Sequence, residues 1–459
     1  MSLRGFLEQM EAEGEILHIK EKISPRFEIA AMMKAFDDGP ILLFENVKGY
    51  SAKVVANVCA TRKRICRALN ISEERLYQKL IEAWRNPTKP KIVKDAPVKE
   101  VVREKFSLSE IPILTHFKYD AGPYITSAVI SAKSPDKKVE NVSIHRLQVL
   151  GNDKLAIRIV PRHLHRLWLL AKEENKDLDV AISIGLHPAV HLAATAAVPF
   201  GISEYYVANT LLRGKFRLVE CEHIDAYAPA EAELVLEGKL STSEMIDEGP
   251  LVDITGTYDI KRKQPIVKIV GVMHRQDYLY QALLPSGNEH KLLMGLSRET
   301  TIWEAVSKVV PKVKAINLSP GGGGWLHAII SIEKQTEGDA KNALLAAFAA
   351  HPSLKHAIVV DTDINVYNLE EVEWAIATRF QASEDLIIIP NARGSTLDPS
   401  ADQETGTTTK MGIDATRPLK KPKEKFERAE ISKSRNVEEL IEKYMAKHSL
   451  NSKHGEGAH

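Results

Sequence analysis

The spacing of hydrophobic residues changes character twice along this chain, which divides it into three stretches. The first stretch, 1–98, mixes helical and strand patterns. It opens with an apolar stripe at helical spacing, made of Leu3, Phe6, Leu7 and Met10. Apolar runs at 41–47 and 53–58 predict short buried strands, and 72–85 predicts an amphipathic helix. A segment rich in proline and lysine, 86–97, indicates a linker.

The second stretch, 99–300, is dominated by strand patterns. Its β-branched runs of strand length are separated by turn residues and cover 125–132, 142–150, 155–160, 180–186, 251–259 and 265–274. Two helical patterns interrupt them, at 161–176 and 204–213. Strands separated by turns rather than by regular helices favour an antiparallel sheet or barrel over a doubly wound fold.

The third stretch, 301–459, alternates between helical and strand patterns. The expected helices and strands lie at 302–310, 313–318, 327–334, 338–351, 356–364, 368–380 and 385–390. Polar, proline-containing residues at 391–435 predict a long surface excursion, and 436–448 predicts a terminal helix that docks on its own core or on a second subunit. We therefore expect an α+β protein with three domains, 1–98, 99–300 and 301–459.

Composition and charge exclude several classes of protein. Lys plus Arg is 62 and Asp plus Glu is 61, so the basic excess typical of nucleic-acid binding is missing. The N-terminal residues include acids and no apolar signal segment, and the longest apolar run, 343–350, is too short to span a bilayer. Cys59, Cys66 and Cys221 form no CxxC pair. These features predict a cytoplasmic protein that binds neither nucleic acid nor membrane.

Candidate chemistry begins in a strand-like segment that runs from Asn141 to Arg146. A regular strand would point these two side chains to opposite faces, so both can line one pocket only if the chain bends or bulges near Ser143 and Ile144. A strand-end arginine commonly reaches solvent. The alternative is a carboxylate-binding role, since a guanidinium is always charged and offers a bidentate fork.

Two acids, Glu248 and Asp253, flank the helix-breaking pair Gly249–Pro250. Carboxylates in loops are usually solvated. If the fold instead brings both acids near Arg146, their roles would separate. An ion-paired carboxylate stays charged, and a desolvated one keeps its proton and can donate it.

Asn141, His163 and Glu204 offer an amide oxygen, an imidazole and a carboxylate. Such oxygen-rich ligands, together with a cofactor phosphate, favour Mn²⁺ or Mg²⁺ over zinc. Their spacing is not diagnostic, because sixteen histidines make chance pairings common.

Four consecutive glycines, 321–324, could suggest a phosphate-binding loop. They lack both the Lys-Ser/Thr that ends a P-loop and the context of a dinucleotide-binding fingerprint. A flexible turn before the strand at 327–334 is the better interpretation.

Taken in order, these segments resemble the UbiD family of reversible, non-oxidative decarboxylases that use prenylated flavin mononucleotide. The likeness covers nearly the whole chain. Its motifs are Asn-x-x-Ile-x-Arg at Asn141–Arg146, the glutamate of PFGISEYY at Glu204, Glu-Gly-Pro-x-x-Asp at Glu248–Asp253, and Lys-Met-Gly-x-Asp-Ala-Thr at Lys410–Thr416.

The resemblance implies an N-terminal α/β domain, a central split β-barrel that binds the flavin, and a C-terminal α/β domain with a terminal helix. Asn141, His163 and Glu204 would hold Mn²⁺ (or Mg²⁺), with K⁺ bound by nearby backbone. Either His163 or its neighbour Arg162 would meet the metal. The expected flavin contacts are Ser143, Ile144, His145, Arg146, Arg158, Ile159, Val160, His163 and Lys410.

The resemblance also implies roles in decarboxylation. Arg146 would hold the substrate carboxylate, Glu248 would fix Arg146, and Asp253 would protonate the carbon that remains. The likeness is greatest to archaeal members, which convert trans-anhydromevalonate 5-phosphate to isopentenyl phosphate in a modified mevalonate route. A flavin prenyltransferase would supply the cofactor, and a homo-oligomer is expected.

Two alternatives remain open. The substrate could be a hydroxybenzoate or another aryl or α,β-unsaturated acid. The second alternative is a protein of a different class, which keeps the fold and binds flavin or assists assembly without catalysis. Arg146, Glu248 and Asp253 argue against it, because nothing in barrel stability requires all three.

Overall fold

The first helix forms where its apolar stripe predicts it. α1 (Leu3–Ala12) begins after Ser2, whose hydroxyl accepts a hydrogen bond from the Gly5 amide at 3.1 Å, and its whole stripe is buried. This computed structural model describes residues 1–429, 431 and 435–452. Residues 1–416 form one unit and the residues from 417 onward a second, each described here by itself.

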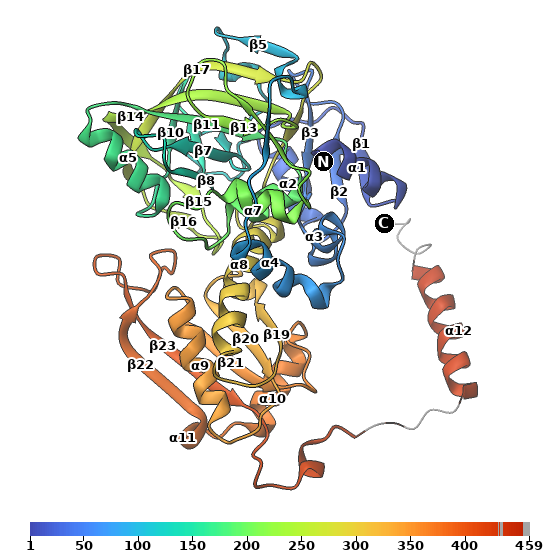
Figure 1. The fold of residues 1–459 in the computed structure, drawn as a ribbon. Coiled ribbons are helices and arrows are strands. Elements are labelled where there is room, and N and C mark those ends of the chain that lie inside the picture. Colours follow the sequence, from blue (N-terminus) through green and yellow to red (C-terminus); the bar gives the residue numbers. More distant parts are fainter. Residues whose placement is uncertain (430, 432–434, 453–459) are drawn as a thin grey trace. The chain divides into compact units, whose positions relative to one another are not determined.

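The N-terminal part combines helices with a small mixed sheet (Figure 1). The helices after α1 are α2 (Glu28–Ala35), α3 (Arg62–Leu69) and α4 (Leu76–Arg85). The sheet has the order β1 (Ile16–Ile19), β2 (Ile41–Phe44), β3 (Lys53–Ala56) and β18 (Leu279–Gln281). Because β18 comes from the central stretch, the N-terminal and central stretches share a sheet.

A curled, half-barrel sheet of nine strands forms the central part (Figure 1). Its order is β6 (Tyr124–Ile125), β9 (Leu147–Val149), β10 (Lys154–Ile157), β17 (Arg262–His274), β14 (Leu234–Glu248), β11 (Leu178–Ile184), β7 (Val129–Lys133) and β8 (Glu140–Ile144), and β5 (Val101–Arg103) also pairs with β17. Every pairing in this sheet is antiparallel, as the strand patterns predict.

Smaller elements surround this sheet. The helices are α5 (His163–Glu173), α6 (Pro188–Ala194) and α7 (Glu204–Leu211). A three-stranded sheet contains β4 (Lys91–Val93), β12 (Arg217–Glu220) and β13 (Tyr227–Pro229), and a separate hairpin pairs β15 (Leu251–Val252) with β16 (Tyr258–Asp259). β4 lies in the segment expected to be a linker, so part of that segment is a strand.

The C-terminal part has helices on both faces of a five-stranded sheet. After the long helix α8 (Asn288–Val306), the sheet runs in the order β19 (Val313–Leu318), β20 (His327–Ile332), β21 (His356–Asp361), β23 (Thr407–Ala415) and β22 (Leu386–Arg393). The remaining helices are α9 (Asp339–Ala350), α10 (Leu369–Arg379) and α11 (Ala382–Asp385). Ile330 packs in the cluster of α9 and Ile329 in that of α10, because successive strand residues face opposite sides.

Two sequence expectations need correction here. The segment 391–435 is not a surface excursion throughout, because β23 lies inside the C-terminal sheet between β21 and β22. The polar side chains of β23 interrupt the hydrophobic alternation by which a strand is recognised in a sequence. The helix expected at 302–310 begins earlier, because α8 runs from Asn288 to Val306.

The second unit contains the expected terminal helix, α12 (Arg435–Ser452). Its apolar residues Val437, Leu440, Ile441 and Tyr444 are exposed, at 43%, 49%, 40% and 62%. The expectation that this helix docks on its own core or on a second subunit stays a prediction.

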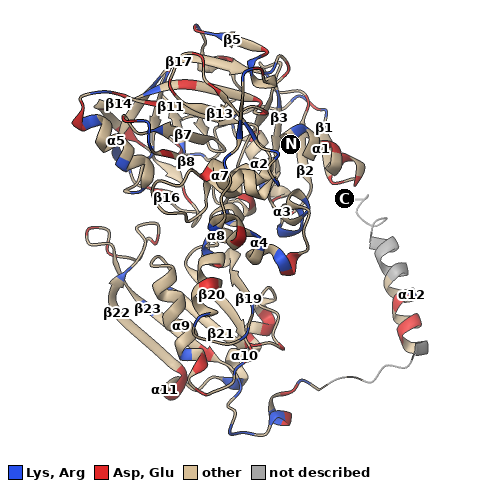
Figure 2. Cartoon of the chain, in the orientation of Figure 1, with Lys and Arg blue, Asp and Glu red and all other residues tan. Residues whose placement is uncertain are grey.

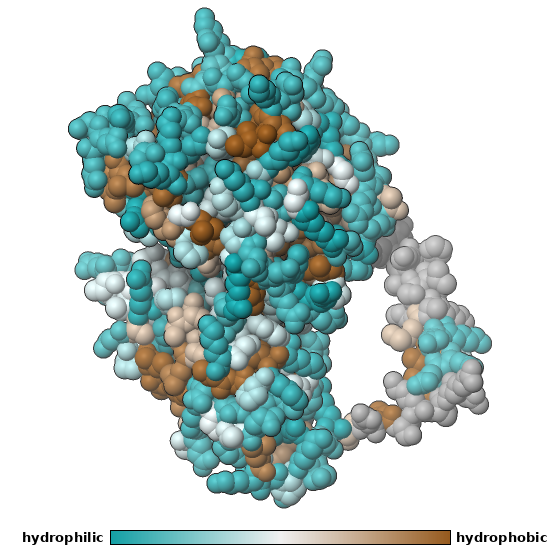
Figure 3. Space-filling model, viewed as in Figure 1, coloured by the Kyte–Doolittle hydropathy of each residue, from teal (hydrophilic) through white to brown (hydrophobic). Residues whose placement is uncertain are grey.

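Charges of both signs alternate along the chain in Figure 2, in agreement with the near-zero net charge. The face shown in Figure 3 is mainly hydrophilic, with hydrophobic residues in separate patches. Within the described residues, no helix has both the length and the apolar character needed to cross a membrane.

Candidate active site

Between Ile144 and Leu147 the chain passes from β8, at one edge of the central sheet, to β9, the second strand from the other edge. β8 pairs with β7 in unbroken register up to Ile144, whereas β9 pairs with β6 and β10 from Leu147 onward. The expected departure from strand geometry is therefore present, but a bulge near Ser143 and Ile144 is wrong. The break lies at His145 and Arg146. Because Arg146 lies outside β8, its side chain does not have to follow the alternation of side chains between the two faces of that strand.

Arg146 is enclosed by three carboxylates. Glu248, the last residue of β14, accepts from Nε through Oε1 and from Nη2 through Oε2, both at 2.9 Å. Asp253 Oδ2 accepts from Nη1 at 2.9 Å, and Asp259 Oδ2 from Nη2 at 3.1 Å. The structure thus brings together the arginine and both acids that the sequence singled out, and adds Asp259.

In this cluster, burial and neighbouring charges shift the pKa values of the side chains in opposite directions. Burial works to lower the pKa of Arg146, but the hydrogen bonds and charge of Glu248, followed by the charges of Asp253 and Asp259, raise it. Burial works to raise the pKa of Asp259, and its ion pair with Arg262 and the charge of Arg146 lower it. The Arg146 guanidinium and the Asp259 carboxylate therefore stay charged.

Glu248 is held in place from its other side as well. Its side chain is fully buried, and the Tyr124 hydroxyl lies 3.2 Å from its Oε1 and 3.0 Å from Gln148 Oε1. Gln148 Oε1 also accepts from the Gly249 amide at 3.1 Å. Asp253 is the more accessible acid, with a side chain 19% exposed. The greater burial therefore falls on Glu248, which anchors Arg146, and not on Asp253, the expected proton donor.

A second group of side chains converges on Glu204, the first residue of α7. Val142 donates its amide to Oε2 at 2.6 Å, and the Asn141 side-chain amide lies 3.1 Å from Oε1. His163 Nδ1 lies 3.6 Å from the same Oε1. The structure therefore brings together the three residues expected to bind a metal. The side chain beside Glu204 is that of His163 rather than that of Arg162.

These three residues fit a divalent cation. Oxygen and nitrogen of an asparagine amide are assigned from hydrogen bonding, so Asn141 turned over would direct Oδ1 toward Glu204 Oε1. Ligands each about 2.0–2.2 Å from one ion lie roughly 3 Å apart, close to the spacings found here. Burial also raises the pKa of Glu204, a cost that a bound cation would offset. Among the described residues no group of three His, Cys, Asp or Glu could hold a metal, so Asn141 would have to complete the set.

Three of the expected flavin contacts lie between Asn141 and Arg146. Ser143 Oγ is 3.0 Å from Asn141 Oδ1 and 2.9 Å from His145 Nε2. His145 Nδ1 is 2.8 Å from the Arg158 carbonyl oxygen, which ties this segment to the next one, and burial lowers the pKa of His145 to about 4. The remaining contact, Ile144, ends β8.

Arg158, Ile159 and Val160 connect β10 to α5. The Ile159 amide donates to Gln264 Oε1 at 2.8 Å, and Val160 is an exposed apolar residue. Burial lowers the pKa of Arg158, whose Nε lies 3.8 Å from Asp259 Oδ2. An apolar surface beside a guanidinium whose charge is only partly compensated suits a ring system that carries phosphate.

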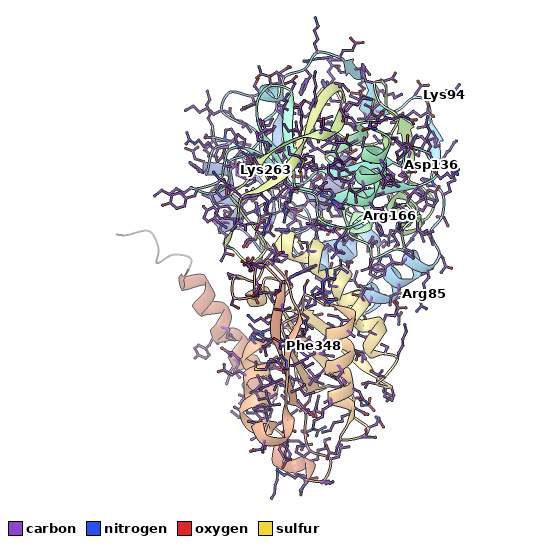
Figure 4. The ribbon with its side chains drawn as sticks, turned by 90° about the vertical axis from the view of Figure 1, so that its left-hand side faces the viewer. Arg85, Lys94, Asp136, Arg166, Lys263 and Phe348 are labelled. Atoms are coloured by element: carbon purple, nitrogen blue, oxygen red, sulfur yellow. The ribbon has the colours of Figure 1, made fainter. Side chains whose placement is uncertain are left out.

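Further cations gather around His351. Burial lowers the pKa of His351 to about 3, and the charges of Arg298, Lys410 and Arg162 add to the effect. Lys410 Nζ donates to the carbonyl oxygens of Pro352, at 2.7 Å, and Leu354, and burial lowers its pKa to about 8. Its Nζ lies 5.6 Å from the ring centre of Phe348, labelled on α9 in Figure 4.

Arg298 is the cation in this group that the sequence reasoning missed. It lies on α8 over the Trp325 ring, 5.5 Å from the ring centre, and burial lowers its pKa to about 10. Among the described residues, none of Arg162, Arg298 and Lys410 has a carboxylate partner. Lys410 is buried and Arg298 is partly buried, and buried cations without counter-charges are typical of sites for anionic ligands such as phosphate.

His290 and Asp259 were also missed. His290 lies in the first turn of α8, where burial lowers its pKa against the charge of Asp253. Asp259 follows Asp253 by six residues and closes the hairpin β15–β16. The sequence analysis predicted one strand at 251–259, and the one available signal was the presence of two acids, Asp253 and Asp259, in that segment.

Three consecutive family models match: the 3-octaprenyl-4-hydroxybenzoate carboxy-lyase N-terminal domain at residues 7–84, its Rift-related domain at 91–288 and its C-terminal domain at 291–415. Fold, site and matches together define a carboxy-lyase.

Individual relatives agree with this class. An anhydromevalonate phosphate decarboxylase of Methanothermobacter thermautotrophicus is 44% identical over 436 residues, 94% of this chain and 100% of the relative. The UbiD-class enzyme HmfF of Pelotomaculum thermopropionicum, solved with FMN, is 44% identical with a TM-score of 0.92, covering 94% of this chain and 97% of that one. An evolved dimeric form of HmfF with prFMN is 41% identical, with a TM-score of 0.88 and the same coverage. The chain belongs to the UbiD family, as its motifs predicted.

Proposed function

We propose that this protein is a non-oxidative decarboxylase that uses prenylated FMN to convert trans-anhydromevalonate 5-phosphate into isopentenyl phosphate and CO₂. One observation carries the proposal. Arg146 is fixed bidentately by the buried Glu248, and Asp253 lies 2.9 Å from its Nη1. A carboxylate-binding cation beside an accessible acid is what removal of CO₂ followed by protonation requires.

The residues act in sequence. Arg146 holds the substrate carboxylate while Glu248 keeps the guanidinium in one plane. The C–C bond to the carboxylate then breaks, CO₂ leaves and the electron pair stays on the remaining carbon. Asp253 donates its proton to that carbon and regains one from solvent.

Cofactor and metal would bind around this cluster. Prenylated FMN, when bound, supplies the electron sink for CO₂ loss. We assign its contacts to Ser143, Ile144, His145, Arg146, Arg158, Ile159, Val160, His163 and Lys410. We assign Mn²⁺ (or Mg²⁺) to Asn141, His163 and Glu204, next to a flavin phosphate, and K⁺ to nearby backbone oxygens.

The relative from Methanothermobacter thermautotrophicus supports the phosphorylated substrate through its name and its near-complete coverage. Arg298 supports it independently. Lys410 and Arg162 would neutralise the flavin phosphate, and a second phosphate on the substrate would give Arg298 its counter-charge. An aryl acid without phosphate would leave Arg298 uncompensated, so the hydroxybenzoate alternative is disfavoured.

The proposal is tested by measuring CO₂ release from protein produced together with a flavin prenyltransferase. The panel contains a phosphorylated methylpentenoate, a cinnamate and a hydroxybenzoate. We expect CO₂ from the phosphorylated acid. CO₂ from an aryl acid alone would support the aryl alternative, and colourless protein without bound flavin would support the non-catalytic alternative.

Replacing Glu204 with Gln tests the metal site without relying on turnover. The amide keeps the size but removes the charge, so we expect Mn²⁺ affinity to fall at least about tenfold. Metal content after dialysis measures it. Glu244→Gln, at an exposed position on β14, is the matched control and should bind metal normally. Equal metal content in both variants would refute the assignment.

Replacing Arg298 with Gln tests the phosphate site. A hydrogen bond to a charged group contributes about 1.5–3 kcal/mol, so the KM for the phosphorylated substrate should rise about 10- to 100-fold. Arg85→Gln, at the exposed surface position labelled in Figure 4, should leave it unchanged. A lower flavin content with an unchanged KM would assign Arg298 to the cofactor instead.

The remaining parts of the proposal concern the whole protein. We propose the domains 1–98, 99–300 and 301–459, a cytoplasmic location, a homo-oligomer and a flavin prenyltransferase as cofactor supplier. The three cysteines are all free thiols, which supports a reducing compartment. The exposed apolar residues of α12 support an interface.

A further inference from the structure

The four-glycine turn, residues 321–324, is closed by its own backbone hydrogen bonds. Gly322 and Gly324 donate their amides to the Ser319 carbonyl oxygen at 3.0 and 2.9 Å, and Gly323 donates to Pro320 at 3.0 Å. These amides are used within the turn and cannot also bind a phosphate. The glycines must therefore serve another purpose, and their surroundings indicate which.

Glycine is needed here for close approach. A methyl group on Gly323 would lie 3.2 Å from the carbonyl oxygen of Ile254, and one on Gly324 would lie 2.9 Å from Lys291 Cβ. The carbonyl oxygen of Gly324 in turn lies 2.9 Å from where Gly295 of α8 would carry its Cβ. The turn thus lies directly against α8 and against the residue that follows Asp253.

Asp253 lies at the tip of a hairpin that has little rigidity of its own. β15 and β16 contribute two residues each and belong to no larger sheet. The tip is closed by Asp253 N to Thr257 O, 3.0 Å, and Gly256 N to Asp253 O, 2.8 Å. Ile254 is fully buried. Asp253 Oδ1 accepts a hydrogen bond from the Ile254 amide at 2.7 Å, so packing against Ile254 from outside the hairpin helps to set the direction of the Asp253 side chain.

We propose that Gly323 is a positioning residue for Asp253. Because it lacks a side chain, the turn can rest on the Ile254 backbone and keep Asp253 Oδ2 within 2.9 Å of Arg146 Nη1. The inference rests on the proposed function only in assigning Asp253 as the acid. The contact itself is independent of that assignment.

Four substitutions separate contact from backbone strain. Gly323→Ala adds a methyl group at φ +70°, and Gly323→Asn adds similar bulk in a residue that tolerates this conformation. Gly406→Ala has nearly the same φ, +68°, with no atom within 4 Å, so it reports strain alone. Gly321→Ala also meets no atom within 4 Å and keeps the turn sequence otherwise intact.

Two measurements decide the proposal. For both Gly323 variants we expect kcat of the flavin-loaded enzyme to fall about 10- to 100-fold with KM and flavin content unchanged, the effect of a small misplacement of a reacting group. We also expect faster amide hydrogen exchange at 251–259, measured by mass spectrometry on protein without added substrate. Gly406→Ala and Gly321→Ala should match wild type in both.

Three results would contradict the proposed role of Gly323. A kcat within twofold of wild type in Gly323→Asn, or an equal loss in Gly406→Ala, would overturn the proposal. So would unchanged exchange at 251–259. If Asp253→Asn retains turnover, the acid assignment fails instead, and the exchange measurement still shows whether Gly323 fixes the hairpin.

Discussion

Asp253→Asn should abolish CO₂ release while flavin binding persists. The amide has the same size and can keep a contact with Arg146, but it has no acidic proton to donate to carbon. General acid catalysis contributes about 10²–10⁴-fold, so kcat should fall by at least two orders of magnitude. Initial rates of CO₂ release and the absorption spectrum of the bound flavin measure the two effects separately.

Asp38→Asn provides the control for this experiment, because Asp38 is an exposed residue outside the site. It should leave both readouts unchanged. Normal decarboxylation by Asp253→Asn would remove Asp253 as the acid.

Arg146→Lys should reduce kcat/KM by more than about 100-fold although it keeps the positive charge. A single ammonium cannot replace the planar fork that bonds both oxygens of Glu248 and also reaches Asp253 and Asp259. Arg146→Ala should lower the free energy of unfolding as well, by about 3–5 kcal/mol, because it leaves carboxylates without their counter-charge.

Steady-state kinetics and denaturant unfolding measure these two results. Arg85→Lys, in an exposed ion pair with Glu304, is the matched control and should change neither. If Arg146→Lys kept more than a third of the wild-type kcat/KM, bidentate fixation by Glu248 would not be part of the mechanism.

Much of the fold could be predicted because local patterns and tertiary packing agree. The stripe of α1 is buried as its spacing predicts, and the central strands pair antiparallel. β23 was missed because its buried positions include the polar residues Lys410 and Asp414, so hydrophobic residues do not mark its buried face. α8 was shortened because Glu289, Ser297 and Glu299 are buried polar residues that interrupt its apolar spacing.

The candidate site shows the same division. Motifs in order pointed to Arg146, Glu248, Asp253, Asn141, His163 and Glu204, and the fold brings the first three and the last three together. Asp259, His290 and Arg298 carry no motif in the sequence reasoning. Only their short distances to partner residues in the folded chain identify them, because those partners lie on other elements.

By itself, then, the sequence determined the chemical inventory of this protein and the family to which it belongs, since residue types and their order are properties of the chain. Only the tertiary structure decided the relationships. The break between β8 and β9 directs Arg146 to its carboxylates, and the glycine turn at 321–324 is a tight contact with the Asp253 hairpin rather than a flexible link. Both depend on which backbone segments approach each other across long stretches of chain, and no local pattern encodes that approach.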